Sequence, residues 1–142
     1  MRGTEPQPTF PFWEGFDEDT VRLIFAAQIQ GQEWGIPYLT SQAILFAAVA
    51  SEGSAGKVLR SFGLNPAVAL AGHTEQQDLH DEDPTIVFRA IEEAKSSVRG
   101  AGVRVTPSAF LAYLISYEDS RAAQYVRALG ISIEDVVTAL RA

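Results

Sequence analysis

The chain has 142 residues, of which 46% are hydrophobic, so it is long enough for one packed domain and is not globally disordered. Its formal net charge of −7 argues against nucleic-acid binding, because phosphate contacts need a basic surface. The absence of cysteine rules out disulfides, thiolate metal sites and a cysteine nucleophile.

The first fifteen residues, MRGTEPQPTFPFWEG, are predicted to form a flexible N-terminal extension. They lack the apolar run of a signal peptide, and no later apolar run is long enough to span a bilayer. The absence of cysteine fits a cytoplasmic location. The extension carries Phe10, Phe12 and Trp13. These aromatics either pin the segment to the domain surface or dock on another protein.

Residues 16–71 are predicted to form four helices. Asp17 caps the first, whose apolar stripe is Val21, Ile24, Phe25 and Ile29, widened by Leu23 and Ala27. The second begins after the cap Thr40 and is apolar almost all round from 43 to 50, which predicts a central, buried helix. The third is expected to be capped at Ser54 and to stop at Gly63-Leu64, and the fourth to run from 65-66 to about 72.

Residues 72–82, GHTEQQDLHDE, are predicted to be an acidic linker. The only two histidines, His73 and His80, lie in it among carboxylates. A metal site is conceivable from these residue types. Because a flexible linker does not fix ligand geometry, we predict a solvated loop, no metal and no catalytic residue.

Residues 83–142 repeat the plan of 16–71. Asp83-Pro84 is the expected cap and first turn of a helix, and Thr106 caps the next one. The stop at Gly130-Ile131 matches the earlier one at Gly63-Leu64, which gives a period of about 67 residues. The sequence therefore predicts an all-α domain of two pseudo-symmetric four-helix repeats, 16–71 and 83–142, that share one core.

These residues resemble the N-terminal double repeat of Clp ATPases. The resemblance runs from about residue 16 to the C-terminus and is clearest in the first copy. Its residues there are Ala27, Gly35, Tyr38, Leu39, Thr40, Ile44, Leu45, Glu52, Gly53, Val58, Leu59, Gly63 and Leu64. The second copy keeps Val105, Thr106, Leu111, Leu114, Ala122, Val126, Leu129, Gly130 and Ile131.

The resemblance implies an eight-helix domain that recruits substrates or adaptors for an unfoldase, or modulates a Clp chaperone or protease. In the ClpC branch such domains also bind phosphoarginine through a glutamate near the start of the second helix of each repeat. The matching positions here are Gln42 and Ser108, so both carboxylates are missing. The candidate binding residues implied are Asp17, Thr40, Gln42, Asp83, Thr106 and Ser108.

No Walker-type phosphate loop is present, so the chain is either a free-standing Clp N-like protein or a piece of a larger ATPase. We expect no enzymatic activity, no cofactor and no membrane or nucleic-acid partner. The expected partner is a protein: a Clp subunit, an adaptor or an unfolded substrate. The alternative is a sensor of a small ligand or a modified residue of the phosphoarginine kind, with a diverged pocket.

Overall fold

The computed structural model describes residues 14–33, 35, 39–65 and 82–142. Within these ranges the chain is helical, without a strand, so the predicted all-α class is confirmed. The predicted fourth helix, both histidines, most of the acidic linker and the aromatics of the N-terminal extension lie outside the described residues. The described helices are α1 (Glu18–Glu33), α2 (Ser41–Ala50), α3 (Ser54–Ser61), α5 (Ile86–Val98), α6 (Pro107–Ser116), α7 (Arg121–Ala128) and α8 (Ile133–Arg141).

The predicted caps of the second helix of each repeat are confirmed. The Thr40 hydroxyl accepts the Ala43 N–H at 3.1 Å, and the Thr106 hydroxyl accepts the Ala109 N–H at 3.2 Å. Both predicted glycine stops are also present. Gly63 and Gly130 have φ values of 98° and 78°, a left-handed conformation that ends a helix at little steric cost in glycine.

Three local predictions were wrong. Gly53, not Ser54, is the N-cap of α3, and it offers no side-chain hydrogen bond. Asp83 and Pro84 lie in a turn before α5, which begins only at Ile86. On α1 part of the predicted stripe faces solvent: Phe25 is 48% exposed and Ile29 59% exposed, whereas the predicted Leu23, Ile24 and Ala27 are buried. The buried face of that helix is Thr20, Leu23, Ile24, Ala27 and Gly31.

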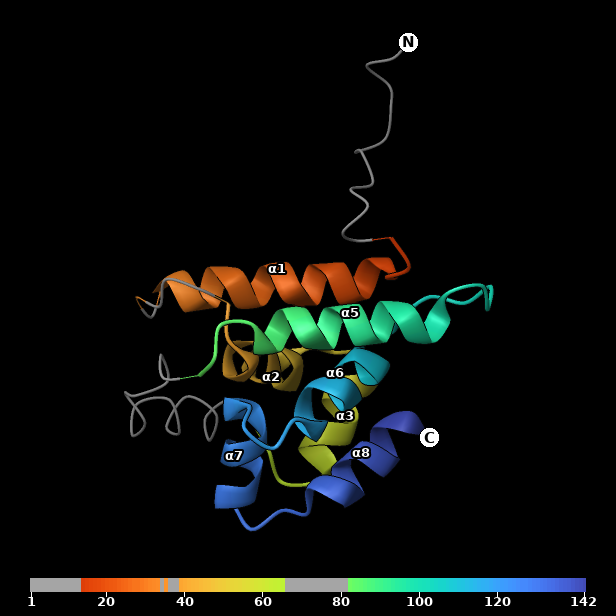
Figure 1. The fold of residues 1–142 in the computed structure, drawn as a ribbon. Coiled ribbons are helices and arrows are strands. Elements are labelled where there is room, and N and C mark those ends of the chain that lie inside the picture. Colours follow the sequence, from red (N-terminus) through yellow and green to blue (C-terminus); the bar gives the residue numbers. More distant parts are fainter. Residues whose placement is uncertain (1–13, 34, 36–38, 66–81) are drawn as a thin grey trace.

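The helices form one body around α2 and α6. In Figure 1, α1 and α5 lie on one side of these two helices, and α3, α7 and α8 on the other. α1 packs mainly on α2, α5 on α6, and α6 on α8. Buried apolar side chains of both repeats belong to one contiguous cluster. This packing agrees with the predicted shared core, while the predicted boundaries at 15/16, 71/72 and 82/83 stay predictions.

A short backbone pairing ties the start of repeat one to repeat two. Phe16 and Val105 form an isolated parallel bridge, in which the Val105 N–H donates to Gly15 O at 2.7 Å. The Asp17 N–H donates back to Val105 O at 3.0 Å. The beginning of α1 is therefore held against the beginning of α6, so this part of the molecule is built from both repeats.

Candidate functional site

Asp17 and Thr106 come from different repeats and lie close to each other. Asp17 bonds to Val105, which precedes Thr106, and its carboxylate caps α1 by accepting the Thr20 N–H at 2.8 Å. Ser108, in the first turn of α6, is half-buried. These predicted residues therefore gather where α1 and α6 begin.

Thr40, Gln42 and Asp83 form a second group at the other end of the pseudo-symmetric arrangement. Asp83 follows Glu82, whose carboxylate accepts the N–H of Ser41, the residue between Thr40 and Gln42. The six predicted residues thus form two groups, each with members from both repeats. Their role in ligand binding stays a prediction.

Asp83 is exposed and serves the turn before α5. Its carboxylate accepts the Thr85 N–H at 2.9 Å and pairs with Arg89 at 3.0 Å. The backbone hydrogen bond from Thr85 is the main cause that lowers the pKa of Asp83, followed by the Thr85 hydroxyl and then by Arg89. The carboxylate therefore stays ionised and is occupied by local contacts.

Gln42 is fully buried at 0% exposure, and neither its amide nitrogen nor its amide oxygen has a hydrogen-bond partner in the structure. A buried amide without partners costs free energy, because it has lost its hydrogen bonds to water. We predict that Gln42→Leu raises the free energy of unfolding by about 1–2 kcal/mol. Urea unfolding followed by circular dichroism measures the change.

The exposed Gln28 on α1 offers a control for that substitution. Gln28→Leu is expected to change the free energy of unfolding by less than about 0.5 kcal/mol. A loss of stability in Gln42→Leu, in place of a gain, would show that the amide of Gln42 makes hydrogen bonds in solution.

Glu82, which the sequence placed in the solvated linker, is instead 3% exposed. One carboxylate oxygen accepts the Ser41 N–H at 2.9 Å, and the other accepts the Arg121 N–H at 2.8 Å and the Ser41 hydroxyl. The Ser41 oxygen in turn accepts the Ala122 N–H at 2.9 Å. Glu82 therefore joins the N-termini of α2 and α7, where helix dipoles favour a negative charge.

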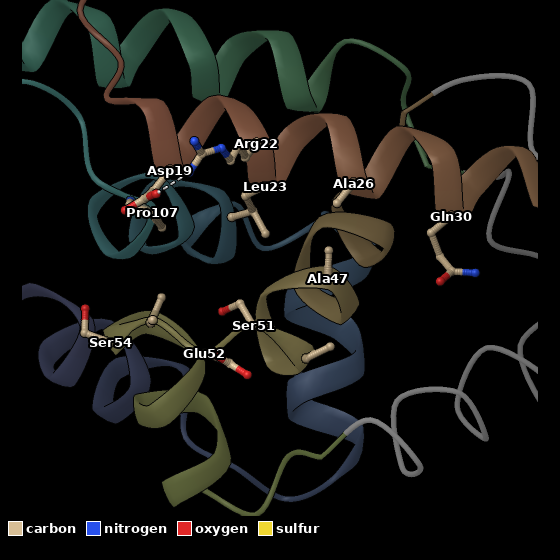
Figure 2. Close-up of a pocket in the computed structure, with 13 residues that line it drawn as sticks. Asp19, Arg22, Leu23, Ala26, Gln30, Ala47, Ser51, Glu52, Ser54 and Pro107 are labelled. Atoms are coloured by element: carbon tan, nitrogen blue, oxygen red, sulfur yellow. Dashed lines mark hydrogen bonds and ion pairs between the residues drawn. The ribbon is translucent and has the colours of Figure 1, made fainter.

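A groove of about 560 Å³ opens between α1, the end of α2 and the start of α3, with Pro107 of α6 at its edge. Figure 2 shows Leu23 and Ala26 of α1 facing Ala47 of α2 across it. We call it the repeat-one groove and define its walls by Leu23, Ala26, Ala47, Ala50, Ser51 and Ala55. Most of the side chains that line it are small and apolar, so the groove offers apolar contact area to a ligand.

The rim of the repeat-one groove carries charge. Arg22 pairs with Glu18 at 3.0 Å and with Asp19 at 3.3 Å, and all three side chains are exposed. Glu52, in the α2–α3 connection, is a further exposed carboxylate on the rim. Asp19 and Glu52 line the groove, and Glu18 lies beside it through its pair with Arg22. Because these carboxylates outnumber the one guanidinium, the rim is acidic and favours a basic ligand.

Tyr117 ends α6 in repeat two and is held by two residues of α5. Its hydroxyl donates to the Glu93 carboxylate at 2.5 Å, and the Arg89 guanidinium carbon lies 5.7 Å from its ring centroid. The pKa of Tyr117 is raised to about 12, first by burial and then by the hydrogen bond to Glu93 and the negative charge of that carboxylate. The phenol thus stays protonated well into alkaline solution.

We predict that Glu93→Gln lowers the pKa of Tyr117, because the negative acceptor is removed. The folded-state pKa lies above the unfolded value of about 10, so this contact stabilises the fold below that pH and its contribution is lost as pH rises towards 12. Tyrosinate absorbance at alkaline pH measures the shift. Glu92→Gln, at an exposed neighbour, is the control, and identical titrations of both variants and wild type contradict the prediction.

The part of the chain that the structure describes holds no group of three or more histidines or carboxylates placed to bind a metal ion. None of its helices is long and apolar enough to cross a membrane.

No protein-family model and no curated protein sequence matches the chain. Its structure, however, is similar to the crystal structure of the N-terminal domain of ClpD, a caseinolytic protease-associated chaperone from Arabidopsis thaliana. The similarity has a TM-score of 0.73 at 19% sequence identity and covers 90% of this chain and 96% of that chain. The chain has the fold of a Clp N-terminal domain. The resemblance that the sequence indicated is therefore confirmed at the level of the fold.

Sequence reasoning about this Clp N fold missed Glu82 and the repeat-one groove. Glu82 gave no signal of burial, because it stands at the end of a run of polar and acidic residues. The groove did leave a signal: position by position, repeat one has Ala47 and Ser51 where repeat two has Tyr113 and Tyr117.

Proposed function

We propose that the chain is a non-catalytic protein-interaction domain of the Clp N type, acting in the cytoplasm. It recruits substrates or adaptors, or it modulates a Clp chaperone or protease. The observation that carries the proposal is the repeat-one groove, an open apolar cleft with an acidic rim on a Clp N fold. Apolar walls give affinity for a protein segment, and the charged rim gives selectivity.

Affinity capture tests this function. The tagged chain, immobilised and exposed to a lysate of its own cells, is expected to enrich Clp ATPase or protease subunits, or their adaptors, over a tag-only control. Mass spectrometry identifies the bound proteins. Recovery of abundant background proteins alone, in repeated captures at low salt, would count against the proposal.

A small-ligand sensor is the second candidate, and the unpartnered buried amide of Gln42 is the observation that favours it. A buried polar group without a partner calls for an explanation, and a functional role is one such explanation. Thermal denaturation with phosphoarginine or free arginine tests it. A rise in melting temperature that is lost in Gln42→Leu and Ser108→Ala supports the sensor, and no rise at saturating ligand rejects it.

A further inference from the structure

The two repeats can be compared residue by residue, because their helix ends are equivalent. Thr40 and Thr106 are both N-caps, and Ser51 and Tyr117 are both C-caps whose N–H groups bond the carbonyl three residues before. Ser51 therefore occupies in repeat one the place of Tyr117 in repeat two. By the same spacing of 66 residues, Ala47 corresponds to Tyr113.

The first helices of the repeats align through their buried faces. Ile24 and Ala27 of α1 match Ile91 and Ala94 of α5, all four being fully or almost fully buried. This alignment, with a spacing of 67 residues, has two consequences for the groove. Arg22 takes the place of Arg89, and Ala26 takes the place of Glu93.

Repeat two therefore fills the space that repeat one leaves open. The Tyr117 ring lies between α5 and α6, with Arg89 over its face and Glu93 bonded to its hydroxyl. In repeat one the ring is replaced by Ser51 and its acceptor by Ala26, while the arginine is retained as Arg22. The repeat-one groove thus keeps the walls and the guanidinium of an aromatic site without the aromatic residue.

We propose that the repeat-one groove binds a tyrosine or phenylalanine side chain of a protein partner, in the place that Tyr117 occupies in repeat two. The proposal rests on the protein-interaction function proposed above and names the anchor that this function uses. Arg22 takes the role of Arg89 over the ring, as a cation on an aromatic face. The carboxylates of Asp19 and Glu52 at the rim, and of Glu18 beside Arg22, select an aromatic residue that is flanked by basic ones.

The size of the groove fits a peptide anchor. Its volume of about 560 Å³ lies within the range of roughly 300–1,000 Å³ that is usual for ligand pockets. It therefore has room for a ring together with the neighbouring backbone. Buried aromatic side chains that enter such pockets are the residues that dominate binding energy at protein interfaces.

Two peptides test the anchor: Lys-Gly-Tyr-Gly-Lys and its counterpart with alanine in place of tyrosine. Nuclear magnetic resonance titration of the full chain is expected to show saturable shifts at Ala26, Ala47 and Ser51 with the tyrosine peptide. The alanine peptide is expected to bind at least tenfold more weakly. Equal binding of the two peptides, or shifts confined to other parts of the chain, overturns the proposal.

A double variant that gives repeat one the tyrosine and the glutamate of repeat two tests whether the repeat-one groove is the binding site. Ser51→Tyr with Ala26→Glu supplies the missing ring and its acceptor, and it is expected to abolish the tyrosine preference. Ser61→Tyr, which adds the same side chain at an exposed position of α3 outside the groove, is expected to retain it. Retention in the double variant, shown by its spectrum to be folded, overturns the proposal.

Arg22→Gln keeps the proposal testable if the double variant does not fold, because Arg22 is exposed and its loss leaves the core intact. It is expected to lower the preference for tyrosine over alanine by about threefold to tenfold. An unchanged preference overturns the proposal, because Arg22 is the cation that the site is proposed to share with repeat two.

Capture from lysate with the double variant separates this inference from the proposed function. If the wild-type chain and the folded double variant enrich the same Clp partners, the function stands and the groove is not the site. If the wild-type chain binds the tyrosine peptide at the groove but captures no Clp partner, the aromatic site stands and the Clp role fails.

Discussion

Phe110→Ala is expected to lower the free energy of unfolding by about 3–5 kcal/mol, the usual cost of truncating a fully buried phenylalanine. Phe110 lies on α6, which packs against every other described helix. Its ring meets the ring of Phe16, from the start of repeat one, edge-on with a centroid distance of 5.9 Å. The truncation therefore removes contacts within repeat two and contacts between the repeats.

Equilibrium unfolding in urea, followed by circular dichroism in the far and in the near ultraviolet, measures this loss. Because both repeats share one core, the variant should still unfold in a single transition at which the two signals coincide. Phe88→Ala, at a residue that is 56% exposed, is the control and should cost less than half as much. Equal costs, or two separate transitions, would contradict the shared core.

The caps and stops were predictable because they depend on a few neighbouring residues. Thr40 and Thr106 bond N–H groups three residues ahead, and Gly63 and Gly130 supply a backbone conformation that other residues rarely adopt. Such signals are complete in the local sequence. The repeat, and with it the fold, follows from their recurrence.

The face of α1 was not predictable in the same way. Its apolar residues surround more than half of the helix, so the sequence allows several stripes, and packing on α2 selects one of them. Leu23 and Ala27 turn inward, while Phe25 and Ile29 turn outward. The direction of a helix face is decided by its partner, which the sequence of α1 does not contain.

The candidate site depends on differences between the repeats more than on their likeness. Repeat one has the shorter Ser51 at the position of Tyr117 in repeat two. This difference leaves a groove, because helix packing fixes the backbone and neighbouring side chains do not fill the space. The predicted residues at the starts of α2 and α6 were chosen through a family resemblance. The groove lies instead towards the end of α2, where the repeats differ in side-chain volume.

Glu82 shows how the same symmetry breaks at the repeat starts. Phe16 and Glu82 each precede the first helix of their repeat, and both are buried. Phe16 fills apolar space against Phe110, whereas Glu82 reaches the free N–H groups at the starts of α2 and α7. Phe16 thus stabilises the fold by packing and Glu82 by capping, and a hydrophobic pattern does not reveal the capping residue.

Glu82→Ala is expected to lower the free energy of unfolding by about 2–4 kcal/mol, because it leaves the N–H groups of Ser41 and Arg121 without their acceptor. Glu82→Gln is expected to cost at least half as much although it keeps the shape. Its amide group presents hydrogens to one of the two N–H donors, so one hydrogen bond becomes a repulsion. Urea unfolding at neutral pH measures both losses.

The control for Glu82→Ala is Glu118→Ala. Glu118 is exposed and lies in the connection between α6 and α7, so its loss should change the free energy of unfolding by less than about 0.5 kcal/mol. If Glu82→Ala costs no more than this control, the carboxylate does not hold the two helix starts together. If it costs the expected amount, the acidic stretch before repeat two ends in a structural residue. The join between the repeats then depends on one charge placed against two helix dipoles.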